Sequence, residues 1–131
     1  MSHFSQIKTK IRNLPALQSA LTDMGADWKA GPQTVRGYQG KTETADVVIE
    51  QANGYDLGFK QNVDTGDYEL VADMQYWQQS LSVDGFLNQV TQRYAYHTVV
   101  TETSRQGFQV AEQKTADDGT IRLVLQRWAR S

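Results

Sequence analysis

The residues best suited to chemistry lie close together between Gln92 and His97. This segment reads Gln-Arg-Tyr-Ala-Tyr-His, so a guanidinium, two phenols and an imidazole fall within two turns of an expected helix. Imidazole exchanges protons near neutral pH, and guanidinium binds carboxylate or phosphate through paired N–H groups. His97, beside Tyr94 and Arg93, is therefore a candidate for proton transfer or for binding an anion. No nucleophile elbow or phosphate loop accompanies them in the sequence, and we favour a core position for His97.

Metal and cofactor chemistry has few donors in this chain. His3 and His97 are the only histidines, and there is no cysteine. Neither histidine has a second histidine or a paired carboxylate at ligand spacing, and thiolate sites and cysteine-ligated iron–sulfur clusters are excluded. We therefore expect no metal site and no cofactor.

Aromatic residues offer a second kind of site. Tyr76 and Trp77 are adjacent, and with Trp28 and Trp128 they are candidates for the rim of a partner groove, because rings with a polar tip are favoured at interfaces. Most aromatic residues of a small domain lie in its core, and this is the favoured alternative for these four. The acidic residues of the central strands are expected on a solvated face: Asp46, Glu50, Asp56, Glu69 and Asp73.

Charge argues against a nucleic-acid partner. The formal net charge is −2, and basic and acidic residues are scattered along the chain. Gly37–Lys41 has the composition of a glycine loop that clamps a nucleic-acid backbone, but that motif lies between helices and this one lies between expected strands. A flexible strand connection is the better interpretation.

The first elements are expected to be a strand and a short helix. Alternation over residues 3–11 predicts a strand with one solvated face. Asn13 and Pro15 predict a helix start, and Gly25 predicts its end. From about Thr34 the alternation predicts an antiparallel meander, with tight turns at Asn53-Gly54 and at Asp64–Gly66.

A long helix is expected from Ser82, its N-cap, to Gln106, with Gly107 as the stop. His97 continues its apolar stripe, whereas Arg93 and Tyr96 are expected to point elsewhere. A final hairpin should turn at Asp118-Gly119. The sum is an α+β fold in which the N-terminal strand, the central meander and the C-terminal hairpin form an antiparallel sheet with two helices packed on one face.

A single domain over residues 1–131 is the simplest organisation, since no linker or repeat divides the chain. No window approaches the roughly 20 apolar residues that a membrane span needs. We expect a soluble protein.

Several segments together resemble the family called hypothetical chloroplast open reading frame thirty-five, and the likeness extends from Met1 to Trp128. The segments are Met1–Ile11, Asp46–Glu50, Tyr68–Trp77 and Gln89–His97. The resemblance implies a protein of an oxygenic phototroph, located in the cytoplasm of a cyanobacterium or in the plastid stroma. The family brings no established activity, cofactor or catalytic residue.

Three functions are consistent with these residues. The favoured one is a non-catalytic accessory or adaptor protein that acts through a protein partner, with Tyr76 and Trp77 near the contact. The second is a small-molecule or anion-binding module on the long helix, built from Arg93, Tyr96 and Arg105. The third is a small enzyme that uses His97 with Asp73 or Glu102.

Overall fold

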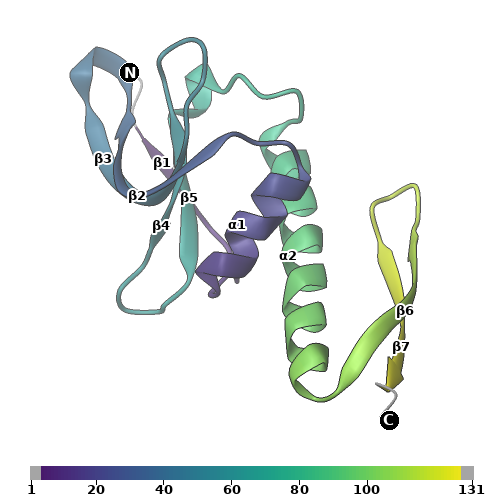
Figure 1. The fold of residues 1–131 in the computed structure, drawn as a ribbon. Helices are drawn as coiled ribbons and strands as arrows, with labels where there is room; N and C mark the ends of the chain where they lie inside the picture. Colours follow the sequence, from purple (N-terminus) through teal and green to yellow (C-terminus); the bar gives the residue numbers. More distant parts are fainter. Residues whose placement is uncertain (1–3, 128–131) are drawn as a thin grey trace.

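The structure, a computed structural model, describes residues 4–127 and contains two antiparallel sheets and two α-helices (Figure 1). The α+β class expected from the sequence is confirmed. The elements follow the order β1 (Ser5–Lys8), α1 (Leu14–Asp23), β2 (Trp28–Arg36), η1 (Tyr38–Gly40), β3 (Thr42–Ile49), β4 (Leu57–Gln61), β5 (Tyr68–Ala72), η2 (Met74–Tyr76), α2 (Val83–Arg105), β6 (Phe108–Thr115) and β7 (Ile121–Arg127), where η marks a short 3-10 helix.

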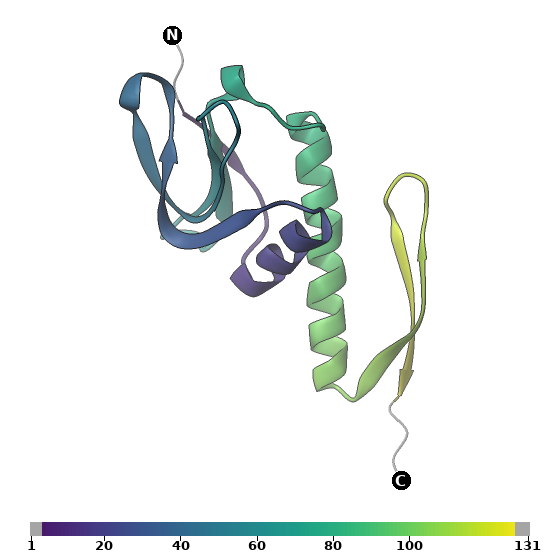
Figure 2. The same cartoon turned by 45° about the horizontal axis from the view of Figure 1, so that its top comes forward.

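The larger sheet has five strands in the order β1-β5-β4-β3-β2, and every neighbouring pair is antiparallel. The C-terminal hairpin differs from the expectation of one sheet, because β6 and β7 form a two-stranded sheet of their own. Figures 1 and 2 show α2 between the five-stranded sheet and this hairpin. Alternating residues predict a strand, but they do not say which sheet it joins.

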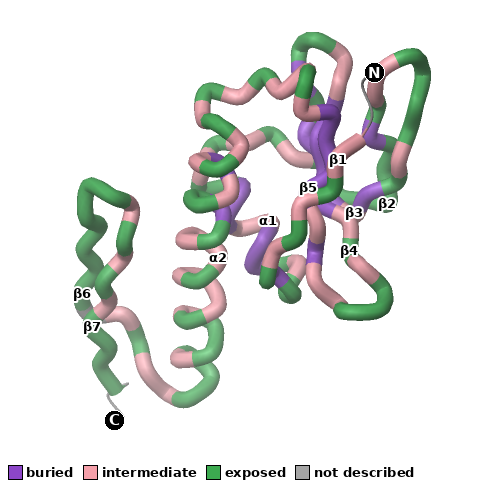
Figure 3. The backbone as a smooth tube through the Cα atoms, turned by 180° about the vertical axis from the view of Figure 1, so that it is seen from behind, coloured by how far each residue is buried: buried purple, intermediate pink, exposed green. Residues whose placement is uncertain are grey.

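The main core lies where the five-stranded sheet meets α1 and α2. Leu17 and Leu21 of α1, Phe59 and Leu70 of the sheet, and Val90 of α2 are all fully buried in it. A smaller cluster of Val35, Ala45 and Val48 packs against Phe4. Figure 3 shows that burial concentrates in the sheet and α1, whereas the hairpin is mostly exposed.

Both helices begin and end close to where the sequence predicts. The Asn13 side chain accepts the N–H of Ala16 at 3.1 Å, and the Ser82 hydroxyl accepts the N–H of Gly85 at 3.1 Å. Gly107 follows α2 with a φ of +87°, a left-handed conformation that favours glycine. None of the described helices is long and apolar enough to cross a membrane.

Some strand boundaries differ from the expectation. β1 is shorter than the strand expected over residues 3–11, and β2 begins at Trp28 rather than near Thr34. The expected two-residue turn at Asn53-Gly54 is part of a longer connection between Ile49 and Leu57. That connection leaves Tyr55 outside the ladder, where it is available for a different contact.

Candidate functional site

Arg93 and His97 converge on one carboxylate at the end of α1. Asp23 Oδ2 accepts the Arg93 Nε–H at 2.9 Å and an Arg93 terminal N–H at 2.6 Å, and it lies 2.6 Å from His97 Nε2. Arg93 therefore does not point away from His97 as expected. We call Asp23, Arg93 and His97 the Asp23 cluster.

The Asp23 cluster is partly shielded, with side-chain exposures of 29% for Asp23, 27% for Arg93 and 25% for His97. Burial by itself raises the pKa of Asp23, but the hydrogen bonds and positive charge of Arg93 and His97 outweigh it, so this pKa lies below its ordinary value. The carboxylate compensates the Arg93 charge, which leaves less attraction for an anionic ligand. The cluster joins α1 to α2.

Tyr94, the next residue along α2, holds the other end of α1. Its hydroxyl accepts the backbone N–H groups of Arg12 and Asn13, both at 3.1 Å. His97 also lines an open hollow of about 390 Å³ beside α1, together with Trp28 and five residues of α1: Pro15, Gln18, Ser19, Thr22 and Asp23.

The acids considered as partners of His97 have other contacts. Asp73 caps η2 by accepting the N–H of Gln75 at 3.2 Å, and Glu102 accepts an N–H of the Gln106 side chain at 3.1 Å. The carboxylate beside His97 is that of Asp23, which the sequence did not single out. Its proximity arises because α1 crosses α2, and no local pattern encodes that crossing.

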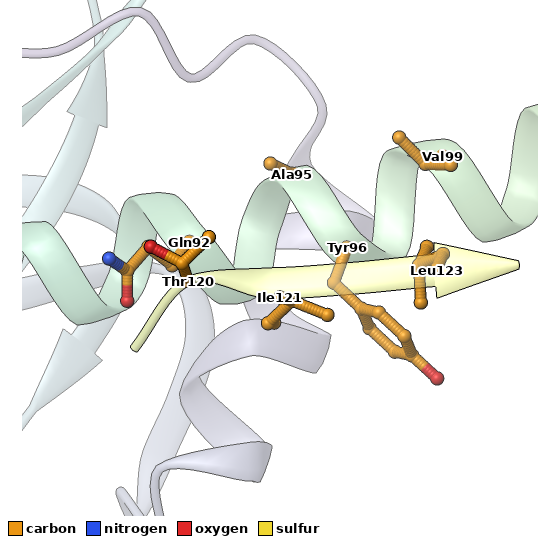
Figure 4. A pocket seen from close by; sticks show the side chains of 7 residues that line it. All are labelled: Gln92, Ala95, Tyr96, Val99, Thr120, Ile121 and Leu123. Carbon is orange, nitrogen blue, oxygen red and sulfur yellow. The ribbon is translucent and has the colours of Figure 1, made fainter. Parts of the chain in front are cut away.

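Tyr96 and Arg105 lie in different surroundings along α2. The Arg93 guanidinium carbon lies 4.6 Å from the centre of the Tyr96 ring. Tyr96 also lines an apolar hollow of about 220 Å³ between α2 and β7, together with Gln92, Ala95, Val99, Thr120, Ile121 and Leu123 (Figure 4). Arg105 is twelve residues from Arg93, about 18 Å along a straight helix, and lines a separate hollow with Glu102. The structure thus does not bring Arg105 to the Asp23 cluster.

Tyr76 and Trp77, although adjacent, have different roles. Trp77 packs edge-on against Phe86 with ring centres 5.3 Å apart, and its Nε1–H donates to the Leu81 carbonyl at 2.8 Å. Trp77 therefore supports the core. Tyr76 instead stacks between two other tyrosines, 4.2 Å from Tyr55 and 5.6 Å from Tyr38, with interplanar angles of 16° and 17°.

We call Tyr38, Tyr55 and Tyr76 the tyrosine platform. The three rings come from η1, from the connection between β3 and β4, and from η2, and all three residues are half-buried. Three tyrosine rings stacked in this way form an aromatic cluster whose phenol groups remain able to form hydrogen bonds.

The buried amide of Gln51 fixes two of the segments that carry the platform. Its Nε2 donates to the carbonyls of Tyr55 at 2.6 Å and Tyr76 at 3.2 Å. Its Oε1 accepts the N–H of Gln78 at 2.8 Å and a side-chain N–H of Gln79 at 2.9 Å. One side chain thus satisfies groups on both segments, which keeps the Tyr55 and Tyr76 rings in place.

An ion pair lies beside the third segment. Asp56 is 2% exposed and receives the Arg36 guanidinium at both oxygens, each at 2.8 Å, and the Arg36 backbone N–H at 2.9 Å. The carboxylate raises the pKa of Arg36 through this hydrogen bond and its charge. Arg36 directly precedes Gly37 and Tyr38, so the pair anchors the start of η1.

The expectation that the acidic residues of the central strands lie on a solvated face is wrong for Asp56 and Asp73. Asp56 is buried as described, and Asp73 is only 4% exposed, with no hydrogen-bond partner for its Oδ2 among the described residues. Both residues lie at strand ends beside the platform, where the simple alternation of a strand no longer holds.

The sequence pointed to Tyr76 but missed Tyr38 and Tyr55. Tyr38 and Tyr55 are 17 positions apart, and Tyr55 and Tyr76 are 21 positions apart, so no short motif joins them.

Within the described residues, no group of three or more His, Asp or Glu side chains is arranged to hold a metal ion. His3 and Trp128 lie outside the described residues.

Comparison with known proteins places the chain among uncharacterised relatives. A family model described as "Protein of unknown function (DUF1257)" matches residues 20–124. The chain is 43% identical over 129 residues to the "Uncharacterized protein ycf35" of Cyanophora paradoxa, and 43% identical over 128 residues to that of Guillardia theta. In both comparisons 98% of each chain is covered, and the protein of the same name from Pyropia yezoensis is 39% identical with the same coverage.

No solved structure matches the chain. The relatives come from plastid-bearing organisms. The family match covers most of the chain and the relatives align over nearly their whole length, so the protein belongs to the ycf35 family, DUF1257, whose function is unknown.

Proposed function

We propose that this protein is a non-catalytic accessory protein that binds a protein partner through the tyrosine platform, in the cytoplasm of a cyanobacterium or in the plastid stroma. The observation that carries the proposal is the stack of Tyr38, Tyr55 and Tyr76 at one end of the five-stranded sheet. Tyrosine is among the residue types that contribute most to binding energy at protein interfaces.

The platform has little ordering cost on binding. Tyrosine offers a large contact area with only two side-chain torsions, and stacking restricts those torsions in advance. The Gln51 amide holds the Tyr55 and Tyr76 segments through their carbonyl groups. Preorganisation of this kind raises affinity by reducing the entropy lost when the complex forms.

The charges around Arg36, which precedes the platform residue Tyr38 by two positions, are paired. Arg36 already pairs with buried Asp56 and lies 3.6 Å from Glu50, and Glu50 also receives Lys29. These charges compensate one another, so attraction depends on ring packing and on hydrogen bonds to the phenol groups. We infer a partner that presents apolar side chains with hydrogen-bonding groups beside them.

His97 Nε2 lies beside the same carboxylate that binds Arg93. The arrangement links two helices and so serves the fold. An adaptor needs a stable scaffold and a contact surface, and we assign these two roles to the Asp23 cluster and to the half-buried tyrosine platform.

The test is a quantitative affinity purification from a phototroph extract with tagged wild-type protein, Tyr38→Ala and a control. Tyr38 has the outermost ring at the wider spacing, so its loss should leave the fold intact. Tyr96→Ala is the matched control, since Tyr96 is a half-buried tyrosine on a different surface. A partner recovered stoichiometrically by wild type and Tyr96→Ala should fall about tenfold or more with Tyr38→Ala, a loss of about 1.4 kcal/mol.

Recovery of the partner by Tyr38→Ala and by Tyr55→Ala at the wild-type level, with both variants folded by circular dichroism, would refute the platform as the binding surface.

A further inference from the structure

The C-terminal hairpin is a sheet of two strands with unused edges. Among the described strands, β6 and β7 pair only with each other. An isolated two-stranded hairpin is marginally stable in water. Here Tyr96 and Val99 of α2 line the same hollow of about 220 Å³ as Ile121 and Leu123 of β7 (Figure 4).

The two edges of this hairpin are unequal. β6 carries a bulge between Val110 and Glu112, and Glu112 forms an ion pair with Lys114 at 3.4 Å on the same strand. Bulges and charged side chains are the usual means by which proteins prevent pairing at a sheet edge. β6 is therefore a protected edge.

β7 lacks a bulge, although it carries the charged side chains of Arg122 and Arg127. The bulge adds its extra residue to β6, so β7 runs regularly from Ile121 to Arg127. Val124 is 47% exposed and Leu125 is 38% exposed. A regular edge strand with exposed aliphatic side chains is a template for another strand.

The sequence of β7 is complementary to itself when two copies run antiparallel. With Val124 opposite Val124, Leu123 lies opposite Leu125, and Arg122 lies opposite Gln126. Arg127 lies opposite Ile121, so no position sets two like charges against each other. Pairing around a twofold axis places the same residues of both copies in the contact, and it gives a closed dimer.

We propose that a second copy of this chain pairs with the edge of β7, so that the two hairpins form one antiparallel sheet in the order β6-β7-β7-β6. The contact buries Val124 and Leu125 of both chains and satisfies the free backbone groups of β7. The hairpin lies on the opposite side of α2 from the five-stranded sheet, so the tyrosine platform remains available in each copy (Figure 1). The inference goes beyond the proposed function and does not depend on it.

The absence of cysteine from the chain permits a direct test with Val124→Cys. Residues directly opposite in an antiparallel pair have Cα atoms about 4.5–5.5 Å apart, within the range that a disulfide spans. Mild oxidation of dilute Val124→Cys should give a covalent dimer on a non-reducing gel. Lys114→Cys is the matched control, because Lys114 is exposed on β6, the outer strand, and should remain a single chain.

Equal crosslinking of Val124→Cys and Lys114→Cys, or none in either, would overturn the proposal. Sedimentation equilibrium gives an independent measurement. Wild type should have twice the 14.8 kDa mass of one chain. Val124→Lys, which sets two ammonium groups at the axis, should have the mass of one chain with an unchanged circular dichroism spectrum.

Val63→Lys is the control for added charge, since Val63 is 91% exposed in the turn between β4 and β5, and it should keep the dimer mass. If Val124→Lys unfolds, the crosslinking result decides. A wild-type protein that stays a monomer throughout the concentration series, or a dimer that Val124→Lys leaves unchanged, would contradict pairing through β7.

Discussion

The carboxylate of Asp23 connects α1 to two residues of α2. It is the last residue of α1, and it receives two N–H groups of Arg93 and lies beside His97 Nε2. Arg93 and His97 lie about 70 residues from Asp23 along the chain. The contact therefore fixes the relative position of two helices that form separately. Partly exposed ion pairs of this kind contribute modestly to stability, about 0.2–1 kcal/mol.

Asp23→Asn should lower the free energy of unfolding at pH 7 by about 0.5–1 kcal/mol. The pKa of Asp23 is lowered in the folded state, so its charged form contributes stability above the ordinary pKa of about 3.9 and loses it as the pH falls through the lower, folded-state pKa. The difference between wild type and Asp23→Asn should therefore disappear at acidic pH. Urea unfolding at several pH values measures it, with Asp64→Asn in an exposed turn as the control; a difference that persists below the folded-state pKa would contradict this account.

Leu17 and Leu21 are 0% exposed in the main core. Leu17→Ala or Leu21→Ala should reduce the free energy of unfolding by roughly 2–5 kcal/mol, because each leaves a cavity between α1 and the sheet. Chemical denaturation tests this. Val63→Ala, at an exposed position, should change stability by less than about 0.5 kcal/mol, and similarly small values for both leucines would contradict their burial.

At the scale of elements, local signals predicted the helices well. Ser82 and Gly107 delimit α2 because capping and left-handed backbone are decided by neighbouring residues. The hairpin was also predicted around Gly119, but its separation from the main sheet was not, since pairing between distant strands depends on tertiary packing. For the same reason the platform could be anticipated only at Tyr76.

The cap of α2 offers a test of this element. Ser82→Ala removes the hydroxyl that accepts the Gly85 N–H and should cost about 1 kcal/mol of stability. Ser80→Ala, in the preceding connection, should have little effect. Thermal unfolding of the two variants measures the difference, and equal melting temperatures would show that the cap does not contribute.

At the scale of the whole molecule, stability should be distributed unevenly. β4 lies at the centre of the five-stranded sheet and contributes Leu57 and Phe59 to the core, whereas the hairpin rests on one side of α2. Regions with few buried contacts open at lower free energy than the core. We therefore expect the hairpin to open at a lower free energy than the five-stranded sheet, and a second strand paired with it should raise that free energy.

Hydrogen exchange can measure this dependence. Amides of β4 should be strongly protected at every protein concentration. Amides of β7 should exchange faster as the protein is diluted, because dissociation of the proposed dimer frees its edge. Concentration-independent exchange in β7 would contradict a role for self-association in ordering the hairpin.

The four hydrogen bonds of Gln51 also have a mechanical consequence. Its amide ties the Tyr55 and Tyr76 carbonyls to Gln78 and Gln79, and that segment leads directly to Ser82 at the start of α2. Gln51 thereby joins the segments that carry two of the rings to the connection that enters α2, so the position of these rings and the start of this helix depend on the same side chain.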